Sequence, residues 1–236
     1  MALPFFYSND ITAGQNTILL NEETSKHIVQ VLRMQNGEQL QLTDGKGNLF
    51  TTEIINNNKR SCEVAVLTTD HRPQITRKIS IAISLVKNAS RFEWFLEKAT
   101  EIGVTEIIPL ICTRTEKQHF RYDRMKTIIV SAMLQSQQVW LPVLHEPVKF
   151  ANEQIVKFAN EQKLIAHCEN EKKTPLGHLQ TSKFANMLIC IGPEGDFTKE
   201  EIELSLKNDF IPVSLGNTRL RTETAGIVAA TLLAQL

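Results

Sequence analysis

Two glycine-containing loops near the carboxyl terminus carry most of the side chains that could do chemistry. The first is Gly192–Asp196, which follows an apolar run, and the second is Gly216–Glu223, which ends in Arg-Thr-Glu. Neither loop fits a phosphate cradle, because the chain contains neither G-x-G-x-x-G nor G-x-x-x-x-G-K-[ST]. Glu194, Asp196 and Glu223 add negative charge, which favours a cationic or neutral ligand over a triphosphate. These residues predict an enzyme with a pocket lined by glycine backbone.

Regular elements around these loops would place them at one edge of a sheet. Met187–Ile191 and Phe210–Leu215 are short apolar runs that predict strands, and each is followed by or ends at a glycine turn. Thr198 and Glu201 form a T-x-x-E capping box, which predicts the start of a helix. The final helix, from about Glu223, is apolar nearly all round, so its own chain or a partner must bury it. Open α/β sheets bind ligands at the carboxyl ends of their parallel strands, where we expect both loops.

The preceding segment predicts more of the same sheet. Ser90 and Glu93 form a second capping box, and Gly103 is placed to end the helix that they open. The predicted elements are strands over Lys78–Val86, Val104–Cys112 and Lys163–His167 and helices over Ser90–Ile102 and Tyr122–Gln138. The fold class expected for this part of the chain is therefore α/β with a mostly parallel sheet.

The amino-terminal part predicts a separate, smaller, β-rich module. Short strand-like runs alternate with Asn-Gly, Asp-Gly and Asn-rich turns. The expected elements are a helix over Glu22–Met34 and strands over Ile18–Leu20, Gln39–Thr43, Leu49–Ile55 and Cys62–Thr68. Proline and charge replace periodicity in His71–Arg77, so we expect one domain over residues 1–72 and another over 73–236.

Composition and cysteine spacing exclude several classes of protein. With 42% hydrophobic and 22% charged residues, and no apolar run near the roughly 20 residues that span a bilayer, the chain is typical of a soluble cytoplasmic protein with no membrane partner. Its first residues lack the basic and apolar regions of a secretory signal. The cysteines show no CxxC and the histidines no ligand spacing, so we expect no metal site. We expect the thiols to be reduced and buried, namely those of Cys62, Cys112, Cys168 and Cys190.

Charge is distributed unevenly along a chain whose net charge is zero. Residues 1–70 carry 5 Lys and Arg against 8 Asp and Glu, residues 71–126 carry 11 against 6, and residues 127–236 carry 10 against 12. The basic middle block is able to supply phosphate contacts to a nucleic acid. An ordinary solvated helix face explains the same excess, and charge alone favours that second interpretation.

Three short motifs, GPEG, LG and LRTETA in that order, resemble those of a known family. IGPEGDFTKEE followed by SLGNTRLRTETA is similar to the carboxyl-terminal signature of the SPOUT (trefoil-knotted) RNA methyltransferases, and within them to the RsmE family. HIVQVLRMQNGEQLQLTDGKGNLF resembles that family's PUA-like RNA-binding domain, and EKATEIGVTEIIPL also matches. The resemblance implies a trefoil-knotted methyltransferase domain after a small PUA-like barrel. It also implies methylation of N3 of a uridine in 16S ribosomal RNA of the small subunit.

The resemblance implies S-adenosylmethionine as the cofactor, bent against three loops. These loops lie around His167–Glu169, Ile191–Asp196 and Leu215–Arg221. Glycine would leave bare backbone for the adenosine where a Cβ would intrude. The cofactor-binding residues expected are His167, Cys168, Ile191, Gly192, Glu194, Gly195, Leu215, Gly216, Leu220 and Arg221.

Uracil N3 attacks a methyl group only after it loses its proton, so the site needs a cation and a proton acceptor. Arg221 matches the motif position that we expect to stabilise the uracil anion, and Arg219 is the rival cation. Glu223 would orient Arg221 or accept the proton. The alternative, that Glu223 only caps the last helix and pairs with Arg221, is at least as well supported by the sequence.

The expected partners are the ribosomal RNA of the small subunit and a second copy of the chain. The family resemblance predicts RNA contacts at Arg33, Lys46, Arg91, Arg114 and Arg124. The apolar final helix and the resemblance together predict a homodimer in which the partner covers that helix.

Departures from the family pattern leave two alternatives open. Asp196 replaces the usual second glycine after GPEG, Leu134 and Gln138 replace an acidic and a basic residue, and Phe5 replaces a basic residue. One alternative prediction is a non-catalytic RNA-binding module with a degenerate knot, although the intact LRTETA argues against decay. A SPOUT methyltransferase that acts on another RNA is the second alternative.

Overall fold

The structure, a computed structural model, divides the chain into two compact units. It describes residues 3–11, 14–74, 77–150, 162–170, 172–179 and 186–236. The first unit comprises Met1–Gln74 and Met133–Leu141, and the second comprises Ile75–Ala132 and Pro142–Leu236. The predicted boundary between residues 72 and 73 assigns Met133–Leu141 to the second domain, whereas the structure packs that segment with the first unit.

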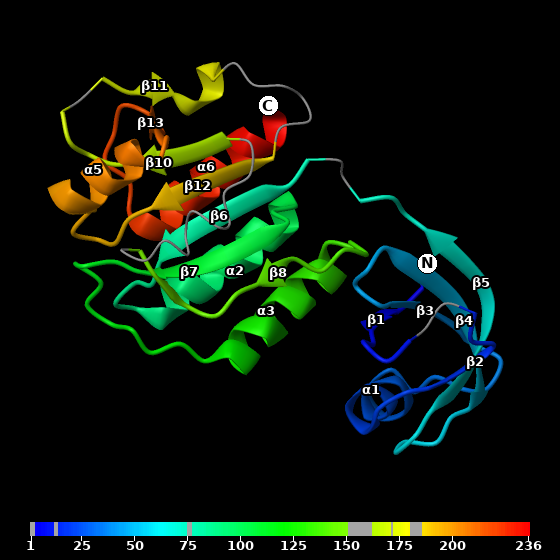
Figure 1. Cartoon of the computed structure of the whole chain (residues 1–236). Coiled ribbons are helices and arrows are strands. Elements are labelled where there is room, and N and C mark those ends of the chain that lie inside the picture. Colours follow the sequence, from blue (N-terminus) through cyan, green and yellow to red (C-terminus); the bar gives the residue numbers. More distant parts are fainter. Residues whose placement is uncertain (1–2, 12–13, 75–76, 151–161, 171, 180–185) are drawn as a thin grey trace. The chain divides into compact units, whose positions relative to one another are not determined.

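The first unit is built on a five-stranded sheet with the order β1-β3-β4-β5-β2 (Figure 1). Its strands are antiparallel except for the parallel pair of β1 and β3. The elements are β1 (Phe5–Tyr7), β2 (Thr17–Leu19), α1 (Glu22–Lys26), β3 (Gln39–Thr43), β4 (Asn48–Asn56) and β5 (Glu63–His71). The β-rich class predicted for this part is confirmed.

The helix predicted over Glu22–Met34 is shorter and less regular than expected. The α-helix α1 ends at Lys26, and the chain continues as a π-helix over His27–Val31. Arg33 then has a φ of 57°, a left-handed conformation that ends the helix.

Met133–Leu141 completes the first unit by closing over the turn between β3 and β4. The Val139 carbonyl accepts a hydrogen bond from Gly47 N at 2.9 Å, and Leu141 N donates to the Gly45 carbonyl at 2.9 Å. The Trp140 indole donates to the Arg72 carbonyl at 2.9 Å. A Cβ on Gly47 would lie 2.4 Å from the Trp140 ring, so only glycine fits beneath it.

The second unit is an α/β fold with an eight-stranded sheet whose pairings are all parallel, which confirms the predicted class. The strand order is β11-β13-β10-β12-β6-β7-β8, with β9 also paired to β7 (Figure 1). The strands are β6 (Ile79–Ser84), β7 (Glu106–Ile111), β8 (Val143–Leu144), β9 (Val148–Lys149), β10 (Gln162–Ala166), β11 (Thr174–Pro175), β12 (Met187–Ile191) and β13 (Ile211–Ser214). The helical elements are α2 (Ala89–Ile102), α3 (Tyr122–Gln135), η2 (Leu176–His178), α5 (Lys199–Lys207) and α6 (Thr222–Gln235).

The strand order separates the two glycine loops. Their strands, β12 and β13, are not neighbours, because β10 lies between them and pairs with both. Strand adjacency depends on pairing across the sheet, which the order of residues along the chain does not specify. The end of β10 therefore lies between the two glycine loops.

The capping motifs and terminal glycine read from the sequence predict the ends of α2 and α5 correctly, with one error. Thr198 and Glu201 form the predicted capping box of α5, and Gly103 ends α2 with a φ of 97°. The second predicted capping box is wrong, because Asn88 caps α2 by accepting from Ser90 N, and Glu93 pairs with Arg124. Asparagine is as strong an N-cap as serine, and it comes two residues earlier.

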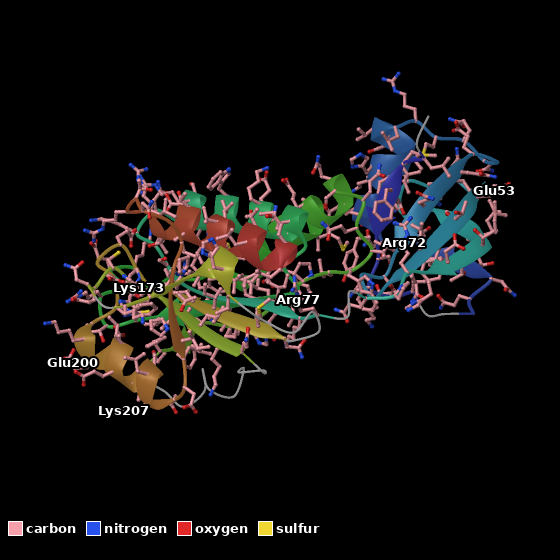
Figure 2. The ribbon with its side chains drawn as sticks, turned by 90° about the horizontal axis from the view of Figure 1, so that it is seen from above. Glu53, Arg72, Arg77, Lys173, Glu200 and Lys207 are labelled. Atoms are coloured by element: carbon pink, nitrogen blue, oxygen red, sulfur yellow. The ribbon has the colours of Figure 1, made fainter. Side chains whose placement is uncertain are left out.

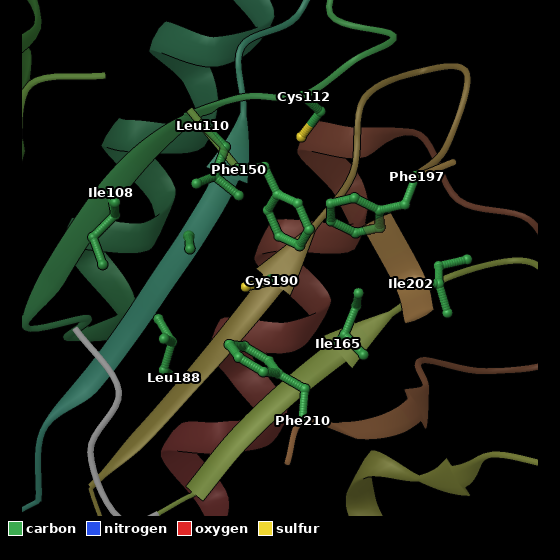
Figure 3. Close-up of a cluster of buried hydrophobic side chains, with 11 residues drawn as sticks. Ile108, Leu110, Cys112, Phe150, Ile165, Leu188, Cys190, Phe197, Ile202 and Phe210 are labelled. Atoms are coloured by element: carbon green, nitrogen blue, oxygen red, sulfur yellow. The ribbon is translucent and has the colours of Figure 1, made fainter. Parts of the chain in front are cut away.

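An aromatic cluster fills one face of the sheet of the second unit (Figure 3). Phe150 and Phe197 pack with ring centroids 4.7 Å apart, beside Phe210. On the opposite face, α6 contacts α2, β6 and β12. Three cysteines are buried as predicted, whereas Cys168 is exposed because it follows the end of β10.

None of the described helices combines the length and the apolar character needed to cross a membrane.

Close packing of α6 depends on Gly226, where an added Cβ would lie 2.7 Å from atoms of Ile83 and of Phe95. Gly226→Ala should therefore lower the free energy of unfolding by about 1–3 kcal/mol, the usual cost of overpacking a core. Denaturant titration followed by circular dichroism would measure it. Gly177→Ala is the control, since a Cβ there meets only Leu232 at 3.7 Å. Equal stability of the two variants would contradict the role given to Gly226.

Candidate functional site

A cavity of about 650 Å³ opens at the carboxyl ends of β10, β12 and β13. Three loops and the first turns of α6 line it. From the end of β10 and the loop after it come Ala166, His167, Cys168 and Lys173. From the end of β12 and the loop after it come Ile191, Gly192, Pro193, Glu194 and Asp196. From β13 onward come Val213, Ser214, Leu215, Gly216, Asn217, Thr218, Arg219, Leu220, Arg221, Thr222 and Ala225.

The structure brings the predicted cofactor-binding residues together. All of them line the cavity except Gly195. Of the two predicted catalytic residues, Arg221 lines the cavity and Glu223 does not. The three segments converge because β10, β12 and β13 are parallel neighbours whose carboxyl ends share one edge.

Backbone and side-chain hydrogen bonds hold the loop after β12 from several sides. Glu194 accepts from Lys87 N at 2.9 Å, and the Gly192 carbonyl accepts from Thr222 Oγ1 at 3.0 Å. Arg114 Nη1 donates to the carbonyls of Gly195 at 2.7 Å and Phe197 at 3.3 Å. The loop is thus fixed to the ends of β6 and β7 and to the start of α6.

Asp196 connects this loop to the loop after β10. Its Oδ2 accepts from Cys168 N at 2.8 Å, and its Oδ1 accepts from Phe197 N at 2.9 Å. Its φ is 62°, a left-handed value that glycine adopts most readily and that aspartate tolerates better than most other residues. The departure from glycine therefore keeps the backbone shape and adds a carboxylate.

The loop after β10 is also fastened to itself. Lys173 Nζ donates to the carbonyls of His167 at 2.7 Å and Glu169 at 2.8 Å (Figure 2). Burial, followed by the negative charge of Asp196, raises the pKa of the Cys168 thiol above its ordinary value. The thiol is therefore protonated at neutral pH.

The two loop glycines have different reasons to be glycine. A Cβ on Gly192 would lie 3.1 Å from atoms of Phe197, so the packing of the protein itself favours glycine here. Gly192 also lines the cavity, where its bare backbone faces the space expected to hold a ligand. Gly216 has a φ of 142° and no atom within 4 Å of its would-be Cβ, so it does leave open space.

The cavity carries both signs of charge. Glu194 and Asp196 line it, but both carboxylates accept backbone hydrogen bonds, and three cations line it too: Lys173, Arg219 and Arg221. The carboxylates noted in the sequence are therefore accompanied by cations, of which Lys173 comes from the loop after β10.

Glu223 is buried in the first turn of α6, where its negative charge faces the positive end of the helix. Its Oε1 lies 3.7 Å from Arg91 Nε, so its ion pair is with Arg91 and not with Arg221. Its Oε2 is buried without a hydrogen-bond partner among the residues that the structure describes. Arg221, two residues earlier, is exposed and is the N-cap residue of α6.

The predicted RNA contacts fall into two groups. In the first unit, Arg33 and Lys46 are exposed, and neither forms an ion pair within the described part of the chain. In the second unit, each predicted side chain has a partner: Arg91 has Glu223, Arg124 has Glu93 at 2.5 and 2.8 Å, and Arg114 has two carbonyls. The ion pair with Arg124 lowers the pKa of Glu93.

Sequence reasoning missed Ala166, Lys173, Val213, Ser214, Thr222 and Ala225 in the lining. No local signal marks Lys173, because its role depends on how the loop after β10 folds back. No group of three or more His, Cys, Asp and Glu in the described ranges could hold a metal ion.

Comparisons with known proteins agree with this architecture. The family model of the RNA methyltransferase domain matches residues 73–234, and that of the RNA methyltransferase PUA domain matches residues 20–67. Ribosomal RNA small subunit methyltransferase E of Synechocystis sp. is 30% identical over 218 residues, 90% of this chain and 71% of the relative.

Two solved structures are similar over nearly their whole length. A probable rRNA-methyltransferase from Porphyromonas gingivalis is 36% identical, with a TM-score of 0.90, over 99% of this chain and 98% of that chain. A ribosomal RNA small subunit methyltransferase E from Neisseria gonorrhoeae, solved bound to S-adenosyl methionine, is 26% identical, with a TM-score of 0.87, over 99% and 97%.

Arg114 gives a direct test of how the loop after β12 is held. Arg114→Ala should speed amide hydrogen exchange in residues 192–198 by about three- to tenfold, because a net hydrogen bond stabilises by about 0.5–1.5 kcal/mol. Mass spectrometry of exchanged peptides would measure it. Arg124→Ala is the matched control, since its partner Glu93 lies on α2. Equal exchange in both variants would contradict the role of Arg114.

Proposed function

Because the chain belongs to the RNA methyltransferase family, we propose that it methylates N3 of a uridine in 16S ribosomal RNA, with S-adenosylmethionine as the methyl donor. The observation that carries this proposal is the cavity at the carboxyl edge of the second unit, where the GPEG and LRTETA segments meet. Relatives named ribosomal RNA small subunit methyltransferase E support the choice of substrate.

The residues present fit S-adenosylmethionine. The cavity of about 650 Å³ is in the size range of small-molecule sites, and its wall at Gly216 has no Cβ to intrude. When bound, this cofactor supplies a methyl group on a positively charged sulfur. Ile191, Leu215 and Leu220 offer apolar surface to it, and the loops at His167, Cys168, Gly192, Glu194 and Gly195 supply or shape the backbone around it.

In the proposed reaction Arg221 stabilises the uracil anion. Its side chain is exposed, it lines the cavity, and its backbone is fixed because its carbonyl accepts from Ala225 N at 2.7 Å. A cation held at this position favours loss of the N3 proton, since the negative charge that results spreads over the neighbouring oxygens. Arg219 also lines the cavity and is the rival cation.

Glu223 has two roles in the proposal that experiment can separate. Its unpartnered Oε2 is able to accept the N3 proton, whereas its burial and its pairing with Arg91 support a role in stabilising the first turn of α6. The absence of Glu223 from the cavity lining favours the second role.

Each unit offers its own support for an RNA substrate. Arg33 and Lys46 present unpaired cations on the first unit, whose residues 20–67 match the PUA domain. Asp44 accepts from Lys46 N at 2.7 Å, which fixes the turn that carries Lys46. Arg91, Arg114 and Arg124 would contact RNA through the guanidinium N–H groups that their partners within the protein leave available. A ribosomal substrate places the reaction in the cytoplasm.

The proposal includes two further family features, the trefoil knot and a homodimer. The sheet order, with β12 between β10 and β6 and the returning α6 packed on β6 and β12, is compatible with threading of the chain. On α6, Ile227, Val228 and Leu232 are partly exposed, so the helix is less buried than its apolar sequence requires.

The homodimer predicts a mass near twice 26.7 kDa in multi-angle light scattering at micromolar concentration. Val228→Asp should shift the protein toward the monomer, because it would place a charge in an apolar interface. A wild-type protein that is monomeric and fully active would contradict this part of the proposal.

Arg221→Ala should lower kcat by about 10²- to 10³-fold, the usual effect of removing a group that stabilises developing negative charge. The affinity for S-adenosylmethionine, measured by isothermal titration calorimetry, should change little. Raising the pH should restore part of the activity, because more uracil is then deprotonated without help. Turnover near the wild-type value at pH 7 would show that another group, with Arg219 first in line, stabilises the anion.

Glu223→Gln completes that experiment. As a proton acceptor, Glu223 would be needed for turnover, and the variant would lose kcat while keeping its melting temperature. As a helix-stabilising residue, it would lower the melting temperature and leave kcat nearly unchanged.

Mass mapping of 16S ribosomal RNA from a deletion strain tests the function as a whole. Loss of one methylated uridine, restored by the wild-type gene and not by the Arg221→Ala variant, is the expected result. A methylated nucleotide missing from a different RNA in the deletion strain would identify that RNA as the substrate. Unchanged methylation in all RNAs, with ribosome binding retained, would favour the non-catalytic module.

A further inference from the structure

Asp196 is the point where two cavity loops are joined by a single side chain. Its Oδ2 accepts from the backbone N–H of Cys168, on the loop after β10, at 2.8 Å. Its Oδ1 accepts from Phe197 N at 2.9 Å, and its own N–H donates to the Pro193 carbonyl at 2.9 Å. Both carboxylate oxygens are thus used, and each takes a different backbone donor.

The neighbours of Asp196 are themselves fixed, so the connection reaches the core. Phe197 is buried against Phe150, and Gly192 packs against Phe197. On the other side, Cys168 follows His167, whose carbonyl accepts from Lys173. A hydrogen bond from Cys168 to Asp196 therefore ties a surface loop to a segment that the aromatic core holds in place.

We propose that Asp196 is a positioning residue that fastens the loop after β10 to the loop after β12 and thereby pre-organises the cofactor cavity. This inference rests on the proposed function, because it names S-adenosylmethionine as the ligand whose affinity depends on the fastening. In the family pattern of the sequence, glycine at this position would supply the backbone conformation alone. Here the side chain supplies a connection as well.

The physical reason is the entropy of the open loop. A loop that is free before binding must be ordered when the ligand binds, and the affinity falls by the free energy of that ordering. The Asp196 carboxylate holds the backbone of Cys168, on the loop after β10, through one hydrogen bond that needs no ligand. Hydrogen bonds to a charged acceptor are stronger than neutral ones, which makes a carboxylate effective here.

Two substitutions separate the backbone from the side chain. Asp196→Gly keeps the left-handed backbone accessible and removes both acceptors. Asp196→Asn tolerates the same backbone but has one acceptor oxygen, which cannot serve Cys168 N and Phe197 N as the two carboxylate oxygens do. We expect the dissociation constant for S-adenosylmethionine, measured by isothermal titration calorimetry, to rise about tenfold or more in Asp196→Gly and less in Asp196→Asn.

The chain offers a matched control in Asp209. It has the same φ of 62°, follows α5, and does not line the cavity. Asp209→Gly makes the same chemical and conformational change away from the loops, so its dissociation constant should stay within about twofold of the wild-type value. Melting temperatures of both variants show whether a change in affinity reflects general destabilisation.

Cys168 provides a second readout that needs no cofactor. Cys62, Cys112 and Cys190 are buried, so a disulfide reagent such as dithionitrobenzoate reports on Cys168. The charges that act on this thiol are Asp196, Arg219 and Lys173. Removing Asp196 lowers the thiol pKa, so rates are compared at a pH high enough that the thiol is ionised in every variant. There the rate reports access to the sulfur, and Asp196→Gly should react about tenfold faster than Asp209→Gly.

The outcomes distinguish this inference from the proposed function. Weaker cofactor binding and faster thiol reaction in Asp196→Gly alone would support it. Cofactor affinity and thiol rate equal to those of Asp209→Gly would overturn it while leaving the proposed function intact. A wild-type protein that does not bind S-adenosylmethionine would overturn the proposed function, and the thiol rate would then decide by itself whether Asp196 fastens the two loops.

Discussion

The cavity depends on the packing of Phe197 against the bare backbone of Gly192. This contact allows the chain to turn sharply after β12 and return its next aromatic side chain to the core beside Phe150. A Cβ at position 192 would lie 3.1 Å from Phe197, so Phe197, whose carbonyl meets Arg114, would have to shift by a few tenths of an ångström. The position of the loop is therefore set by core packing before any polar contact is made.

Hydrogen bonds then attach the loop after β12 to several neighbouring segments. Glu194 accepts from Lys87 N, the carbonyls of Gly195 and Phe197 accept from Arg114, and Asp196 accepts from Cys168 N. The acidic side chains of this loop, Glu194 and Asp196, therefore accept hydrogen bonds from backbone N–H groups. That leaves Arg219 and Arg221 as the cavity residues with exposed positive charge on the loop that leads into α6.

The first unit shows the same reliance on a glycine beneath an aromatic ring. Gly47 lies under Trp140, which also reaches the Arg72 carbonyl, so the turn that carries Lys46 is rigid although Lys46 itself is exposed. A rigid turn with an unpaired cation is suited to a phosphate contact, because little side-chain or backbone freedom besides that of the lysine is lost on binding.

The sequence by itself determined what depends on residues within a few positions of one another. The strand Met187–Ile191, the capping box of Thr198 and Glu201, the stop at Gly103 and the motifs that identify the family are all local patterns. Only the tertiary structure decided which distant residues meet: β10 between the two glycine-ended strands, Arg114 on Gly195, Asp196 on Cys168, and Arg91 on Glu223. These contacts join residues 28 to more than 100 positions apart. Local propensity carries no information about that choice, whereas the packing of the parallel strands fixes it.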